Sequence, residues 1–171
     1  MDKLASYCLL GEDEKYQRGV VYLYGSGFME CLKLFHITDE EGVHYIAKTI
    51  TQALQISYQT YKHSTFDMCV DVSNFSLRHL RRSFIILMSQ FLQQAFPEKM
   101  NYCYVHHTPP LFASVYDLID KLNLIDRRTK SKIYIYRDDI QTEDGLNLLS
   151  SKQELEKSIQ KKKTVGDSSV I

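Results

Sequence analysis

The chain lacks tryptophan, contains only three prolines and seven glycines, and carries no net charge over its 171 residues. Its 21 basic residues balance 21 acidic ones, so no overall field would draw the molecule onto nucleic acid, and we expect no nucleic-acid partner. No stretch reaches the roughly 18 apolar residues that a membrane-spanning helix requires. The apolar run within residues 1–10 is too short for a signal peptide. Any membrane contact is therefore expected to be transient and peripheral.

Cysteine is also scarce. Four residues, Cys8, Cys31, Cys69 and Cys103, lie far apart and form no C-x-x-C pair. This spacing argues against a zinc site and against a disulfide framework, and it favours the reducing cytoplasm. Because an unpaired cysteine usually behaves as a small hydrophobic residue, we expect all four in the core.

The residues that are present predict a folded α/β domain. Hydrophobic residues make up 44% of the chain, and β-branched or aromatic runs alternate with segments whose apolar residues recur at helical spacing. Strands separated by helices indicate parallel crossovers, so the fold class is α/β, a mostly parallel mixed sheet flanked by helices. Strands are expected at residues 19–24, 66–72, 102–106 and 133–136, and helices at 38–61, 77–96 and 111–124.

Local signals set the expected boundaries. Thr38, with Glu41 three residues later, is typical of a capping box at the start of the first long helix. Residues 11–18 form a polar turn ahead of the first strand. We expect one domain over residues 11–160, followed by a polar tail over residues 161–171.

No catalytic signature is found in the sequence: there is no G-x-S-x-G elbow, no P-loop, no G-x-G-x-x-G and no H-E-x-x-H. We therefore expect no enzymatic activity and no cofactor. Residues 25–27 (Gly-Ser-Gly) resemble a phosphate loop only in part, and a turn in which glycine supplies positive φ is the favoured interpretation.

Two adjacent histidines, His106 and His107, end a predicted strand. A neutral imidazole can act as a metal ligand or as a base. Adjacent strand residues point to opposite faces, so the rings would converge on one ion only if the strand breaks there. We expect one packed histidine and one at the sheet edge, with no metal site. A hydrolase that uses either ring is the weaker alternative, because no nucleophile or oxyanion signature accompanies them.

Basic residues gather in two places. Arg78, Arg81 and Arg82 form the basic start of the predicted amphipathic helix 77–96, where we expect a solvated face and where an anion partner is the alternative. Residues 127–132 contain four cations and two hydroxyls directly before a predicted strand. Cations and hydroxyl donors suit phosphate oxygens, so this run is the best local candidate for a phosphate site, with an exposed polar turn as the alternative.

Several segments, taken in order, resemble motifs of the CRAL-TRIO family, which includes the phosphatidylinositol transfer proteins. The resemblance extends over residues 13–136. Residues 13–21 are similar to the D-x-x-G-R-P opening turn, 71–76 to the strand-turn-helix, 95–100 to Y-P-E-R-hydrophobic, 104–109 to Y-I-I-N-A-P, and 129–133 to T-x-x-K-I.

The resemblance implies a ligand and its site. In phosphatidylinositol-binding members a glutamate, a threonine and a lysine of these motifs hold the inositol phosphate, and they correspond to Glu98, Thr129 and Lys132. It also implies non-enzymatic binding of a phospholipid or other lipophilic ligand between the sheet and a gate helix, for lipid transfer or sensing. We expect the gate within residues 138–158.

A second hypothesis comes from two parts of the family pattern for which we find no match in this sequence. The helical module that precedes the domain and the L-P-x-x-Y/F-G-G ending have no counterpart in this sequence. This shortened form resembles a divergent branch in which the domain is attached to Rho GTPase-activating or macro domains. The alternative function is therefore a protein-interaction module with a filled core, which binds a small GTPase or associates with itself.

Overall fold

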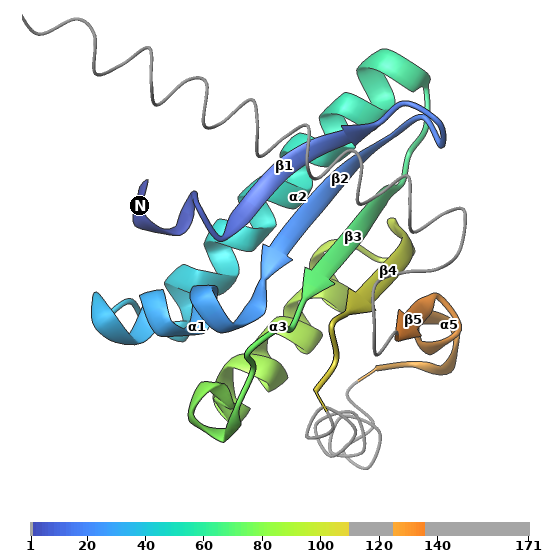
Figure 1. The fold of residues 1–171 in the computed structure, drawn as a ribbon. Coiled ribbons are helices and arrows are strands. Elements are labelled where there is room, and N and C mark those ends of the chain that lie inside the picture. Colours follow the sequence, from blue (N-terminus) through green and yellow to red (C-terminus); the bar gives the residue numbers. More distant parts are fainter. Residues whose placement is uncertain (1, 110–124, 136–171) are drawn as a thin grey trace, which may run out of the picture.

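A computed structural model describes residues 2–109 and 125–135, and its centre is a five-stranded sheet (Figure 1). The strand order follows the chain, β1-β2-β3-β4-β5. The first pair is antiparallel and the other three are parallel, which confirms the predicted α/β class with a mostly parallel mixed sheet. The strands are β1 (Cys8–Asp13), β2 (Arg18–Tyr24), β3 (Phe66–Asp71), β4 (Met100–His106) and β5 (Ile133–Ile135).

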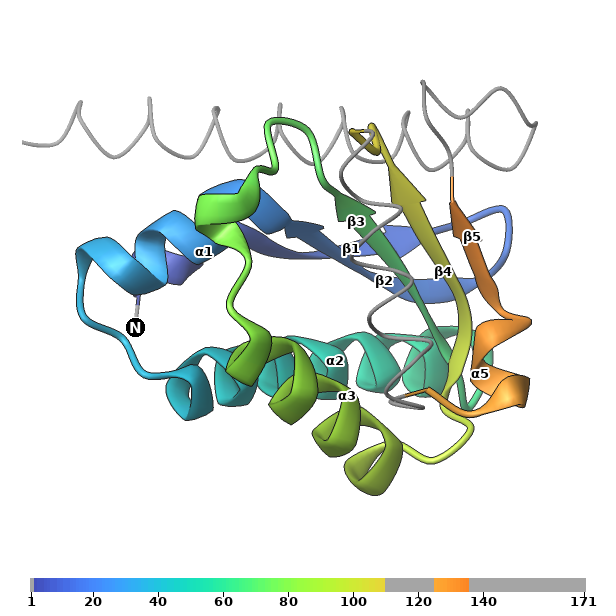
Figure 2. The ribbon, with the colours of Figure 1, turned by 90° about the horizontal axis from the view of Figure 1, so that it is seen from below.

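Two long helices cover one face of this sheet. Figure 2 shows α2 and α3 on the same side, with α1 beyond one end of the strands. None of the described helices is both long and apolar enough to cross a membrane. The predicted helix 111–124, the gate within 138–158 and the tail 161–171 lie outside the described residues. The helices are η1 (Asp2–Leu4), α1 (Gly25–Leu34), α2 (Asp39–Tyr61), η2 (Leu77–His79), α3 (Arg82–Ala95) and α5 (Arg127–Lys130).

The capping box predicted for the first long helix is confirmed. The Glu41 backbone N–H donates to Thr38 Oγ1 at 3.2 Å, and the Thr38 N–H donates to Glu41 Oε2 at 2.9 Å. The helix ends at Tyr61, and its C-cap residue Lys62 has a left-handed φ of 62°, which stops the helix from continuing. These two caps set the length of α2, which packs along β2.

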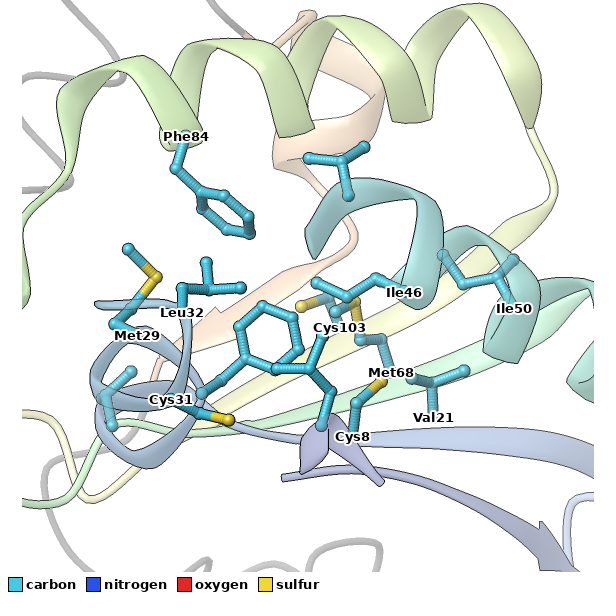
Figure 3. Close-up of a cluster of buried hydrophobic side chains, with 14 of the residues drawn as sticks. Cys8, Val21, Met29, Cys31, Leu32, Ile46, Ile50, Met68, Phe84 and Cys103 are labelled. Atoms are coloured by element: carbon cyan, nitrogen blue, oxygen red, sulfur yellow. The ribbon is translucent and has the colours of Figure 1, made fainter. Parts of the chain in front are cut away.

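Both faces of the sheet are apolar, as expected for a mostly parallel sheet. Side chains alternate along each strand, so Val21 and Met68 enter the large cluster beneath the helices, while Tyr22 and Cys69 enter a smaller one on the opposite face. Figure 3 shows the large cluster, with Ile46 and Ile50 of α2 facing the strands. All four cysteines are buried, which confirms their predicted place in the core.

The N-terminal part of the prediction is wrong. The polar turn expected at residues 11–18 is a hairpin, in which β1 begins at Cys8 and pairs with β2 from Cys8↔Leu23 to Asp13↔Arg18. Only residues 14–17 form the turn between the two strands. Charged residues within β1 hid the strand from a search for apolar runs.

The helix predicted over residues 77–96 is interrupted. Leu80 and Arg81 have extended backbone angles, and they separate η2 from α3. The break places Arg78 against Glu30 of α1, at 2.8 Å, and Arg81 against Asp39 of α2, at 2.7 Å. These two arginines therefore bind acidic side chains of neighbouring helices instead of only facing solvent as predicted.

Residues 25–27 do not form the predicted turn. They are the first residues of α1, which begins directly after β2, and none of the described glycines has a positive φ. A Cβ at Gly27 would lie 2.5 Å from the Tyr7 ring. Glycine therefore allows the close approach of the Tyr7 ring to α1, and its freedom at positive φ is not used.

Candidate ligand-binding site

A pocket of about 310 Å³ opens between the C-terminal end of α3, the beginnings of β3 and β4, and the segment that contains α5. Its lining includes the three residues that the family resemblance assigned to ligand binding, Glu98, Thr129 and Lys132. The other lining residues are Phe66, Leu92, Gln93, Phe96, Pro97, Met100, Asp126 and Arg128.

Glu98 belongs to the turn between α3 and β4. Helix α3 ends at Ala95, and Pro97 cannot continue it because proline has no N–H to donate. The Lys99 N–H donates to the Phe96 carbonyl at 3.2 Å, and Glu98 adopts a left-handed φ of 57°. The tight turn leaves the Glu98 side chain 66% exposed at the pocket.

Thr129 is held by a cap that the sequence analysis overlooked. The Asp126 carboxylate accepts hydrogen bonds from the backbone N–H groups of Arg128, at 2.8 Å, and Thr129, at 2.9 Å. It also accepts from the Thr129 hydroxyl at 2.6 Å. The hydroxyl bond is the main reason that the pKa of Asp126 lies below its usual value. The signal was present in the sequence, since aspartate directly before a short helix is a preferred N-cap.

Lys132 lies where the α5 segment joins the sheet. Its backbone carbonyl accepts from the Cys103 N–H at 2.9 Å, which leads into the pairing of β5 with β4. Its ammonium donates to the Met100 carbonyl at 2.9 Å. The lysine is thereby held over the first residue of β4, inside the pocket lining.

A buried carboxylate orders the strand ends beneath the pocket. Asp67 Oδ1 accepts from the Asn101 side chain at 2.9 Å and from the Tyr102 N–H at 3.0 Å. Burial is the main cause of the raised pKa of Asp67, and these hydrogen bonds oppose the rise. The bonds bridge the register shift between β3 and β4 that falls at Phe66 and Met68.

The charges of the pocket are balanced. Arg128 and Glu98 form an ion pair whose side chains are 73% and 66% exposed. Lys132 and Asp126 add one charge of each sign. An exposed ion pair contributes at most about 1 kcal/mol, so the Arg128–Glu98 pair opens at little cost to a ligand that offers better partners. Of the basic run 127–132, Arg128 lines the pocket together with Lys132.

The two histidines at the end of β4 lie side by side. His106 is the last residue of the strand, and His107 follows with a positive φ of 54°. This turn of the backbone brings the two rings together, with their centroids 4.6 Å apart. The rings converge because the strand ends between them, which is the condition that the sequence set for convergence, while His106 is buried and the His107 side chain is 32% exposed, as predicted.

Comparison with known proteins identifies the family. A sequence model of the CRAL/TRIO domain matches residues 3–163. The chain belongs to the CRAL/TRIO family. Among solved structures, the crystal structure of Sfh5 is similar, with a TM-score of 0.70 and 18% sequence identity, and the match covers 81% of this chain. No curated protein sequence matches the chain.

The comparisons support the fold and the general kind of ligand. This CRAL/TRIO chain spans about half of the Sfh5 chain, 51% of which is covered. At 18% identity the likeness to Sfh5 shows the shared fold alone. Members of the CRAL/TRIO family typically bind lipophilic ligands.

Proposed function

We propose that this CRAL/TRIO domain is a non-enzymatic module that binds a phospholipid, for lipid transfer or sensing, with the phosphorylated headgroup in the pocket described above. The observation that carries the proposal is the meeting of Glu98, Thr129 and Lys132 in one pocket, although they come from two separate segments of the chain. The resemblance that selected these residues rested on motifs in the sequence, their order and their spacing.

The charged side of the pocket supports a phosphate ligand. The Lys132 ammonium carries three donors, one of which bonds to Met100, and a phosphate oxygen can accept from another. The Arg128 guanidinium can donate to two phosphate oxygens at once. A phosphate can therefore replace Glu98 as the partner of Arg128. Glu98, once displaced, can accept hydrogen bonds from ring hydroxyls of an inositol headgroup.

The size and the apolar side of the pocket support a headgroup with the first part of an acyl chain. Phe66, Leu92, Phe96 and Met100 form the apolar side. A volume of about 310 Å³ lies near the lower end of the ~300–1,000 Å³ that small-molecule pockets occupy, which is too small for a whole phospholipid. The remaining acyl surface would be covered by the gate expected within residues 138–158.

The first test is native mass spectrometry of the purified chain, followed by organic extraction and identification of any released lipid. The proposal predicts phospholipid at one molecule per chain, or uptake of phosphatidylinositol from vesicles by an initially lipid-free protein. A protein that purifies without lipid and takes none from vesicles would contradict it. That result would favour the interaction module that binds a small GTPase or a second copy of itself.

Replacement of Lys132 by alanine is expected to weaken phosphatidylinositol binding at least about tenfold, because a hydrogen bond to a charged group contributes about 1.5–3 kcal/mol. Binding is measured by titration with vesicles that contain phosphatidylinositol. Lys130→Ala is the matched control, since it removes the same charge from the same segment at a residue outside the pocket lining. Equal losses in both variants would indicate attraction to the membrane surface, with no specific headgroup site.

Replacement of Asp126 by asparagine is expected to tighten headgroup binding about fivefold, since removing a like charge near a phosphate is worth ~1 kcal/mol at a separation of about 4 Å in water. Asparagine is as good an N-cap as aspartate, so the α5 turn should persist. The change also removes Asp126 Oδ2, the oxygen to which the Thr129 hydroxyl donates, so the hydroxyl can donate to the ligand. The same vesicle titration measures the effect, and weaker binding by the variant would show that the carboxylate helps to hold the ligand.

The proposal places the domain in the cytoplasm, with only transient contact at a membrane surface. The wide separation of its cysteines suits a reducing compartment. A fluorescent fusion that is diffuse in cells and partly recovered with membranes after crosslinking would agree with this placement.

A further inference from the structure

A second group of chemically active side chains lies at the other end of the same strands. Asp71 is the last residue of β3, His106 is the last residue of β4, and the two are direct partners in the register. His107 follows at once. In open α/β sheets, ligands commonly bind at the carboxyl ends of the parallel strands. Met100, which lines the lipid pocket, lies at the other end of β4, about 20 Å away at ~3.3 Å per residue.

The backbone brings these three side chains together at an energetic cost. A positive φ is uncommon for any residue other than glycine, and the φ of His107 is 54°. The effect here is that His106 Nδ1 and His107 Nδ1 lie 2.9 Å apart, and His107 Nδ1 lies 3.3 Å from Asp71 Oδ1.

These separations match the spacing of ligand atoms around one metal ion. With bonds of about 2.0–2.1 Å, two ligands at a right angle are about 2.9 Å apart and two at the tetrahedral angle about 3.4 Å. The three candidate ligand atoms all lie within 4.8 Å of one another. Two imidazole nitrogens that face each other at 2.9 Å share a proton, and a metal ion can replace that proton.

The surroundings of the cluster also suit a metal. The Ser73 N–H donates to Asp71 Oδ1 at 2.8 Å and so orients the carboxylate, as the outer partners of metal ligands commonly do. His106 is fully buried, whereas the His107 side chain is 32% exposed, so an ion can approach from the side of His107.

We propose that Asp71, His106 and His107 bind a divalent transition-metal ion of the Zn²⁺ type, through Nδ1 of each histidine and one carboxylate oxygen. Two imidazoles with a carboxylate suit Zn²⁺ and its first-row neighbours, whereas Mg²⁺ and Ca²⁺ take oxygen ligands. Three protein ligands leave at least one coordination position for water. This site is independent of the proposed lipid pocket.

The test is titration of the purified full chain with Zn²⁺ by calorimetry and with Co²⁺ by visible absorption. We expect one ion per chain. His107→Asn should weaken binding at least about tenfold, since even outer partners of metal ligands contribute that much. Asparagine tolerates positive φ, so the backbone turn is kept. His36→Asn is the matched control, because His36 also has a positive φ, 53°, and lies outside the cluster.

Three results would overturn the proposal. They are the absence of binding at one ion per chain, equal affinities of His107→Asn and the unchanged chain, and a thiolate-to-cobalt absorption band that places the ion on a cysteine. If circular dichroism shows that His107→Asn is unfolded, Asp71→Asn decides in the same assay. That variant keeps an oxygen to accept from Ser73 and removes the charge, so unchanged Zn²⁺ affinity would again contradict the site.

Discussion

Replacement of Gly19 by alanine is expected to destabilise the fold by about 3 kcal/mol or more, at the upper end of the cost of inserting atoms into a packed core. A Cβ at this position would lie 2.1 Å from the Ala53 carbonyl oxygen, which belongs to the backbone of α2. The Gly19 N–H also donates to the buried Ser57 hydroxyl at 2.8 Å. Strand and helix approach so closely here that neither can move aside without breaking this contact.

The measurement for Gly19→Ala is the free energy of unfolding from urea titration, followed by circular dichroism. Gly25→Ala is the matched control, because the nearest atom to its new Cβ is the Asp71 carbonyl oxygen at 3.3 Å. We expect the control to change stability by less than about 1 kcal/mol. Similar stabilities of the two variants would mean that α2 does not pack on β2 as closely as described.

Replacement of Phe84 by alanine is expected to cost about 3–5 kcal/mol, the usual loss for a buried phenylalanine. Among the residues of α3, all of which the structure describes, Phe84 is the one that is buried. Its ring lies 5.9 Å from the Phe28 ring of α1 and packs on Gly42 of α2. It therefore anchors α3, whose far end supplies Leu92 to the proposed lipid pocket.

Urea titration and amide hydrogen exchange of α3 measure the effect of Phe84→Ala. Phe35→Ala is the control, because this phenylalanine is 41% exposed and its ring is covered by the Lys3 ammonium at 3.8 Å. An exposed cation–π contact contributes about 0.5–1 kcal/mol, so the control should lose little stability. If exchange in α3 stays as slow as in the unchanged chain, Phe84 is not the anchor of this helix.

Much of the secondary structure could be predicted from the sequence because its signals are local. The capping box of Thr38 and Glu41 marks the start of α2 within a few residues of chain, and β3, β4 and β5 follow from short β-branched or aromatic runs. The hairpin at β1 escaped prediction because Glu12 and Asp13 interrupt its apolar pattern. The start of α1 escaped because glycines usually indicate a turn.

The candidate site also combines features that the sequence predicts with features that depend on the tertiary structure. Glu98, Thr129 and Lys132 were selected by their resemblance to family motifs, and the structure places them in one pocket. Asp126 as a cap was readable from the sequence, since it directly precedes a short basic helix. The pairing of Arg128 with Glu98 was not, because it depends on how the turn after α3 meets the α5 segment.

The sequence by itself determined the α/β class, the position of most strands, the main helix cap and the family. Those properties follow from hydrogen bonds and apolar periodicity within short stretches of chain. Only the tertiary structure decided that Phe84 holds α3, that the pocket beside α5 has balanced charges, and that His106 and His107 face each other beside Asp71. Such arrangements depend on single backbone angles and on contacts between distant elements, which no local pattern contains.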